Sequence, residues 1–190
     1  MAVWLTTFCD ADMKAWKKLA LGMAVLLTVL LLVGCLLPRH AQVTRSMTLR
    51  AAPETVFERV ATLRRWPEWT AWTTNRFPDL VYRFEGPEQG VGAILIAAGK
   101  SSGDGTVKIT RAVPAEGVTY TLDFNHGSQL FDGLIGFTNS PDGLRVTWTL
   151  TTDLGANPVK RWAGLAMGSL MGGDMAEGLA KLKTQVEERR

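Results

Sequence analysis

An uncharged apolar run from Leu19 to Leu37 constrains this chain of 190 residues more than any other feature. It follows Lys14, Lys17 and Lys18 and ends at Pro38. A helix of this length is about 28 Å long, which is close to the thickness of the hydrocarbon core of a bilayer. The sequence therefore predicts an N-terminal tail (1–18), a single transmembrane anchor (19–37) and one following domain (43–190).

Two cleaved-signal interpretations compete with an uncleaved anchor. A secretory signal peptide has a small-x-small cleavage site after its apolar core, and Pro38-Arg39-His40-Ala41 offers none. Leu32-Val33-Gly34-Cys35 resembles the lipobox of bacterial lipoproteins, in which the cysteine is lipidated. The apolar run continues past Cys35, however, and the leading segment carries Asp10 and Asp12, so we favour an uncleaved span in the cell membrane. The positive charges on the two sides are nearly balanced; we assign the tail to the cytoplasm and the domain to the extracytoplasmic (periplasmic) side.

Composition limits what the remaining residues can be. About 150 residues are enough for one domain with a real core and too few for two. The net charge is only +3, and the basic residues are scattered without interleaved aromatic residues, which argues against nucleic-acid binding. Both cysteines, Cys9 and Cys35, lie before the domain, so we expect neither disulfides nor thiolate metal ligands in it.

The beginning of the domain changes from a strand pattern to a helix pattern. Apolar and polar residues alternate over 43–50, which predicts a strand with one buried face. Pro53 and Glu54 then indicate a helix start, and apolar residues at helical spacing predict a short helix to about Arg65. Three tryptophans follow within seven residues, and we expect this cluster to fill the core where the helix meets the sheet: Trp66, Trp69 and Trp72.

Residues 79–153 consist of short alternating segments separated by turn residues. Gly86-Pro87, Gly99 to Gly105, Asn125-His126-Gly127 and Pro141-Asp142-Gly143 are the clearest turns and loops. The segment 144–151 shows the most regular alternation. Consecutive short strands joined by tight turns predict an antiparallel meander with one buried and one exposed face.

After Asn157-Pro158 the pattern is helical to the end of the chain. Its apolar stripe consists of Leu165, Gly168, Gly172, Met175, Leu179, Leu182 and Val186. Two glycines in a helix interior cost about 1 kcal/mol each relative to alanine, so another interaction must offset them. Either the helix packs closely on a bulky sheet residue such as Trp148, or the missing side chains leave a ligand space lined by Met171 and Met175.

This order of elements resembles the START-like or SRPBCC superfamily, the helix-grip fold of polyketide cyclase/dehydrase-like domains. The resemblance covers 43–190 and is carried by 44–57, the tryptophan cluster, Val146-Thr147-Trp148 and 178–183. It implies an α+β fold in which a curved antiparallel sheet wraps around the C-terminal helix and encloses an apolar cavity. It implies ligand binding more strongly than any reaction. Relatives often carry a tryptophan where this chain has Ala97-Ala98-Gly99-Lys100, so pocket shape cannot be transferred.

No constellation in the sequence predicts catalysis. The two histidines are His40, at the membrane edge, and His126, in a predicted turn, so no nucleophile has a base beside it. No residues have the spacing of a metal site, and Gly99 to Gly105 does not lead into a helix as a phosphate loop does. Surface positions account for the carboxylates nearest to the expected cavity, which are Asp132, Asp153, Asp174 and Glu177. We therefore expect no catalytic residue, no metal and no cofactor.

Three functional classes remain. We favour a membrane-anchored, non-catalytic binding protein for a hydrophobic small molecule or lipid. The alternatives are an enzyme of the cyclase or dehydratase kind, which requires a buried acid or base with a shifted pKa, and an envelope interaction module with a residual cavity. The residues expected to line the cavity are Trp69, Trp72, Tyr82, Phe84, Tyr120, Phe124, Trp148, Gly168, Met171, Gly172 and Met175.

Overall fold

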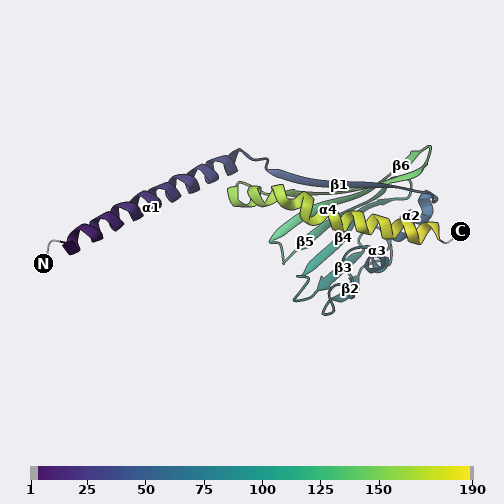
Figure 1. Cartoon of the computed structure of the whole chain (residues 1–190). Helices are drawn as coiled ribbons and strands as arrows, with labels where there is room; N and C mark the ends of the chain where they lie inside the picture. Colours follow the sequence, from purple (N-terminus) through teal and green to yellow (C-terminus); the bar gives the residue numbers. More distant parts are fainter. Residues whose placement is uncertain (1–3, 189–190) are drawn as a thin grey trace.

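A long N-terminal helix projects from a sheet-and-helix domain in the computed structural model, which describes residues 4–188 (Figure 1). This helix, α1, runs from Trp4 to Leu36, so most of the predicted tail is helical and continuous with the apolar run. Its part from Trp16 to Leu36 is long and apolar enough to cross a membrane and is almost entirely exposed. An anchor and a signal sequence both meet this description.

The domain is built on one antiparallel sheet of seven strands in the order β1-β7-β6-β5-β4-β3-β2. From β2 to β7 each strand pairs with the next along the chain, as the predicted meander requires. The strand before the meander, β1, pairs with the last one, β7. The strands are β1 His40–Leu49, β2 Val81–Glu85, β3 Ile94–Ala98, β4 Gly105–Val113, β5 Gly117–Phe124, β6 Gln129–Ser140 and β7 Gly143–Asp153.

Short helices connect β1 to β2. The first, α2 (Pro53–Ala61), begins with Pro53 in its first turn as predicted. It ends four residues earlier than expected because Thr62 is extended, and a single 3₁₀ turn, η1 (Leu63–Arg65), follows. The next helix, α3 (Trp66–Trp69), then carries two of the three clustered tryptophans into the core.

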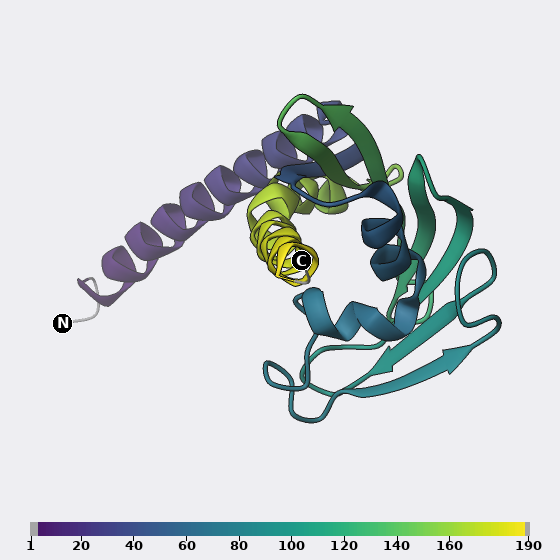
Figure 2. The same cartoon turned by 90° about the vertical axis from the view of Figure 1, so that its right-hand side faces the viewer.

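The C-terminal helix α4 (Pro158–Glu187) lies along the concave side of the curved sheet (Figure 2). The side chain of Asn157 caps its first turn by accepting hydrogen bonds from the backbone amides of Val159 and Lys160. The buried stripe contains Met175, Leu179, Leu182 and Val186, as predicted, whereas Leu165 is 60% exposed and Met167 is buried in its place.

These features confirm the predicted α+β helix-grip fold. The aromatic cluster lies where the sheet, α3 and α4 meet, as the tryptophan spacing indicated. Trp148 is 7% exposed and packs against α4 at Gly178, where a Cβ would lie only 3.0 Å from its ring. The sheet and α4 therefore share one core around the tryptophans.

Candidate ligand-binding cavity

A cavity of about 160 Å³ lies between the concave face of the sheet, α3 and α4. Nearly all of its lining is aliphatic, aromatic or thioether. The lining residues are Trp66, Pro67, Thr70, Ala71, Trp72, Tyr82, Leu95, Val107, Tyr120, Leu122, Phe124, Trp148, Leu150, Met171, Asp174 and Met175. Five strands and two helical elements contribute to it, so the cavity depends on the whole fold.

Trp72 forms one side of the cavity and is held in place from three directions. Its ring meets Phe124 edge to face, with ring centroids 4.8 Å apart. Its carbonyl oxygen accepts a hydrogen bond of 2.6 Å from the Tyr82 hydroxyl. Its ring also lies over Gly105, where a Cβ would approach Trp72 to 2.7 Å. Glycine at the start of β4 thus gives the indole room against the sheet.

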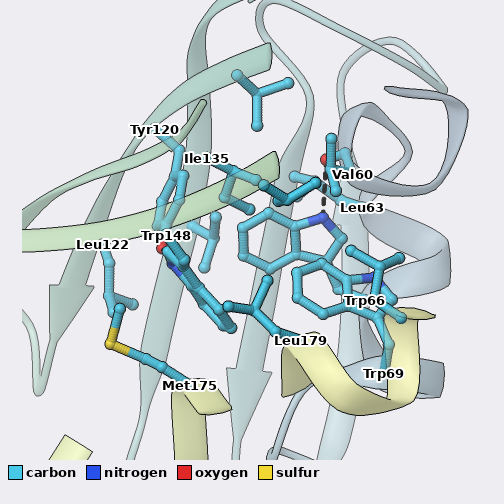
Figure 3. Close-up of a cluster of buried hydrophobic side chains, with 14 of the residues drawn as sticks. Val60, Leu63, Trp66, Trp69, Tyr120, Leu122, Ile135, Trp148, Met175 and Leu179 are labelled. Atoms are coloured by element: carbon cyan, nitrogen blue, oxygen red, sulfur yellow. Dashed lines mark hydrogen bonds between the residues drawn. The ribbon is translucent and has the colours of Figure 1, made fainter. Parts of the chain in front are cut away.

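A second group of aromatic rings at the cavity consists of Tyr120, Trp148 and Trp66 (Figure 3). Tyr120 reaches across β6 because its cross-strand partner is Gly133, whose hydrogen leaves the space that the phenol ring occupies. On the far side of that strand, the indole nitrogen of Trp148 donates a hydrogen bond of 2.7 Å to the Tyr120 hydroxyl. Trp66 packs edge-on against Tyr120, with centroids 5.0 Å apart. The wall is therefore both tightly packed and cross-linked by a buried hydrogen bond.

Burial and ion pairing act on the ionisable groups at the cavity. Burial raises the pKa of Tyr120 far above its ordinary value, so its hydroxyl remains neutral. Burial also raises the pKa of Tyr82. At the mouth, Arg76 donates a hydrogen bond of 2.7 Å to Asp174, and this contact raises the pKa of the guanidinium. The polar groups of the cavity are thus tied to protein partners.

The structure brings most of the predicted site residues together. Seven of them line the cavity, namely Trp72, Tyr82, Tyr120, Phe124, Trp148, Met171 and Met175. Figure 3 shows Met175 pointing from α4 toward Leu122 on the sheet.

Four predicted site residues lie outside the lining, each for a local reason. Trp69 is fully buried behind Trp148, with ring centroids 5.3 Å apart. Phe84 packs against Tyr82. The Cζ atom of Arg64 lies over the Phe84 ring, 4.8 Å from the ring centroid.

The other two predicted site residues, Gly168 and Gly172 of α4, have a different environment from the one expected. Gly172 packs against the guanidinium of Arg45, which leaves no room for a Cβ. The same guanidinium donates a hydrogen bond of 3.2 Å to the carbonyl oxygen of Gly168. Gly172 therefore does pack closely on the sheet, as one explanation required, but its neighbour is Arg45 and not Trp148.

Sequence reasoning missed several lining residues. Val107, Leu122 and Leu150 occupy inward positions of predicted strands, and their alternation is the signal that identifies them. Thr70 and Ala71 come from the segment after α3, where the sequence carries no periodic signal. No cluster of three or more metal-binding side chains occurs among the described residues.

Comparison with known families agrees with this architecture. Residues 40–187 match the model of the family described as polyketide cyclase / dehydrase and lipid transport. The chain belongs to this family. Membership confirms the resemblance drawn from the sequence and implies that the domain binds a hydrophobic ligand, since polyketide cyclase / dehydrase and lipid transport proteins generally do. No curated protein matches the chain.

Several solved structures share this fold. An uncharacterised protein from Rhizobium leguminosarum is 16% identical, with a TM-score of 0.56, and the match covers 79% of this chain and 96% of that one. The di-domain ARO/CYC StfQ of the steffimycin biosynthetic pathway is 12% identical, with a TM-score of 0.59, over 79% of this chain and 51% of that one. Ara h 8.0201 is 13% identical, with a TM-score of 0.55, and the match covers 79% of this chain and 99% of that one. At these identities the likeness shows the fold alone.

Proposed function

We propose that this protein is a membrane-anchored, non-catalytic binding protein for a hydrophobic small molecule or lipid, which it holds in the cavity between the sheet and α4. Its N-terminal apolar helix would keep the domain beside the bilayer, where such ligands are concentrated. Family membership supports the ligand class.

The chemistry of the cavity lining is the observation that carries the proposal. A general acid or base works best when its pKa lies near the working pH. Burial raises the pKa of Tyr120 and so moves it further from neutrality. Tyr120 is therefore not poised for proton transfer. Asp174 is paired with Arg76 at the mouth of the cavity. An apolar wall with few polar groups is typical of a binding pocket.

The cavity volume limits the ligand. Ligand pockets commonly measure about 300–1,000 Å³, and a cavity of about 150 Å³ holds one benzene ring. At about 160 Å³ this cavity takes a ring or a short chain segment without rearrangement. A larger ligand requires the flexible side chains of Met171 and Met175 to move, which methionine permits more readily than branched residues do.

The proposal is tested on the full chain in lipid nanodiscs with 1-aminonaphthalene, an apolar fluorophore that accepts excitation from tryptophan. Val107 lines the cavity, and Ile109, two residues along the same strand, is fully buried outside it. Val107→Phe should fill the cavity and abolish saturable energy transfer while the domain stays folded. Ile109→Phe should overpack the core and lower stability by about 1–3 kcal/mol.

Two results would contradict the proposal. Saturable binding that survives Val107→Phe would mean that the ligand binds outside this cavity. A wild-type chain without saturable binding would mean that the cavity is residual and holds no ligand. Mass spectrometry of ligand extracted from the wild type, with the Val107→Phe chain as control, then identifies the natural ligand class.

A further inference from the structure

The first half of α4 exposes large apolar side chains. Val159 is 65% exposed, Trp162 38%, Leu165 60% and Leu170 72%. The segment 162–173 contains no charged residue. Exposed apolar side chains are common when scattered, but a contiguous group of them marks an interaction site.

Val159 and Leu170 lie on one side of the helix together with two alanines. Val159, Ala163, Ala166 and Leu170 follow each other at steps of four, three and four residues, which places them on a single stripe. All four are exposed, and the stripe lies on the side of the helix opposite to the buried Met175. Figure 2 shows that no element of the domain covers the side of α4 that faces away from the sheet. We call this stripe, together with the adjoining Trp162, the outer face of α4.

The basic residues at the start of α4 are turned away from this face. Lys160 donates a hydrogen bond of 3.4 Å to the carbonyl oxygen of Ser128 on the domain. Arg161 donates to the carbonyl oxygens of Cys35 and Gly155, at 2.6 and 3.0 Å. The outer face is therefore left without a charged side chain.

The last turns of α1 are fixed to the beginning of α4. The Trp162 indole nitrogen donates a hydrogen bond of 3.0 Å to the carbonyl oxygen of Leu30. Gly34 allows the close approach, since a Cβ there would lie 2.8 Å from Pro158 and 2.9 Å from the Trp162 indole nitrogen. Beside this contact, Arg39 pairs with Asp153 at 2.7 Å. Three residues, 37–39, separate α1 from β1, so the domain has no flexible tether.

This junction sets the depth of the outer face relative to a membrane that α1 crosses. Trp162 contacts Leu30, seven residues before the end of the apolar run at Leu37. Seven residues of helix correspond to about 10 Å along its axis. Trp162 would therefore lie about 10 Å below the level at which the run ends, which is at the deep end of the range that interfacial helices reach.

We propose that the outer face of α4 lies in the interfacial region of the bilayer that α1 crosses, so that the domain rests on the membrane with its first α4 turns among the lipids. The lipid surface is the occupant that the contacts select, because the apolar helix α1 reaches the same end of α4 and is continuous with the face. Interfacial helices bury an apolar face to a depth of about 5–10 Å. The inference rests on the retention of α1 and is independent of ligand binding.

The outer face also borders the cavity. Leu170 is the last residue of the stripe, and the next residue, Met171, lines the cavity together with Asp174 and Met175. A membrane in contact with the outer face would thus lie next to the α4 side of the cavity. In the proposed function, this arrangement shortens the path of a hydrophobic ligand between bilayer and pocket.

Spin labels on the full chain in vesicles of phosphatidylcholine and phosphatidylglycerol test the placement. In a background with Cys9→Ser and Cys35→Ala, single cysteines are introduced as Val159→Cys, Ala163→Cys and Leu170→Cys. Val81→Cys and Val91→Cys serve as controls, since both positions are exposed on the domain, at 67% and 59%. We expect the ratio of oxygen to nickel-chelate collisions to be at least threefold higher for the α4 labels than for the controls.

The alternatives give different results. Equal collision ratios at Leu170→Cys and Val91→Cys would overturn the placement. Dipolar broadening at Leu170→Cys that disappears on dilution with unlabelled chain, without raised oxygen access, would assign the face to a second copy and also overturn it. A mature chain whose mass lacks α1 would remove the basis of the inference. The 1-aminonaphthalene assay on the same samples reports ligand binding separately, because Val107→Phe should leave the collision ratios unchanged.

Discussion

The two halves of α4 belong to one continuous helix but have opposite surroundings. In the second half, the apolar stripe of Met175, Leu179, Leu182 and Val186 is buried against the sheet. In the first half, large apolar residues such as Val159 and Leu170 face outward. The second half therefore supplies most of the buried stripe, and the exposed apolar residues of the first half need an explanation outside the domain.

Charged residues show the same contrast. The exposed side of the second half carries Lys181 and Glu177, which pair at 2.6 Å, and Lys183 and Glu187. This is the polar surface expected of a helix that faces water. The first half has no charged residue between Arg161 and Asp174. A single helix thus has a water-facing end and an end suited to lipid.

The largest effect should come from the residue on which the second half packs. Trp148→Ala removes an indole that contacts Gly178 and Trp69 and that donates a hydrogen bond to Tyr120. Deletion of a large buried aromatic side chain costs about 3–5 kcal/mol. Denaturant unfolding of the full chain in a mild detergent, followed by fluorescence, measures the loss. An unchanged midpoint would mean that the second half of α4 does not depend on this contact.

A pair of glycine substitutions compares the environments of neighbouring turns directly. At Gly178 a Cβ would lie 3.0 Å from the Trp148 ring and 3.3 Å from the Trp69 carbonyl oxygen, so Gly178→Leu should overpack the core and destabilise by about 1–3 kcal/mol. Gly173 has no atom within 4 Å of that position. Gly173→Leu should instead stabilise by about 0.5–1 kcal/mol, because leucine favours the helix. Equal effects at both positions in thermal unfolding would contradict the contrast.

The junction between α1 and the first half of α4 should show a smaller effect. Arg161→Ala removes hydrogen bonds to the carbonyl oxygens of Cys35, Leu37 and Gly155. We expect local opening to become easier by about 1.4 kcal/mol, which is about a tenfold faster hydrogen exchange of the amides in 37–41. Exchange in β5 serves as the internal control and should not change. Unaltered exchange in 37–41 would mean that these bonds do not hold the junction.

The fold was largely predictable because its signals are local. Strand alternation, turn residues and the start of the C-terminal helix at Asn157-Pro158 all appear in the sequence and in the structure. The pairing of β1 with β7 has no such local signal, since it joins segments about a hundred residues apart. Only the family resemblance implied that the sheet closes around α4.

The cavity was predictable in part, for a related reason. Alternation identified inward residues such as Tyr120 and Phe124, but it does not tell whether an inward side chain meets the core or an empty space. Gly172 illustrates the limit: its place on the stripe was evident, and its packing against Arg45 depends on a contact between distant elements. The outer face of α4 was missed because the sequence analysis followed only the stripe that begins at Leu165, whereas Val159 and Leu170 lie on another side of the helix.

The smallest effect should be the loss of stability at acid pH from the ion pair between Arg39 and Asp153, which lies beside the junction. Asp153 accepts hydrogen bonds from Arg39 and from the amide of Gly155, and these lower the pKa of its carboxyl from the ordinary value of 3.8. A group whose pKa is lower in the folded state stabilises the fold above its ordinary pKa and loses that contribution as the pH falls toward the folded-state value. Asp153→Asn should therefore lower the thermal midpoint slightly at pH 6, and its difference from wild type should shrink below about pH 4.

Arg39→Ala is the matched control, because it removes the other partner and should show the same convergence, while the double variant should add nothing further. A difference that stays constant from pH 6 to pH 2 would show that the pair does not link this end of α1 to the domain.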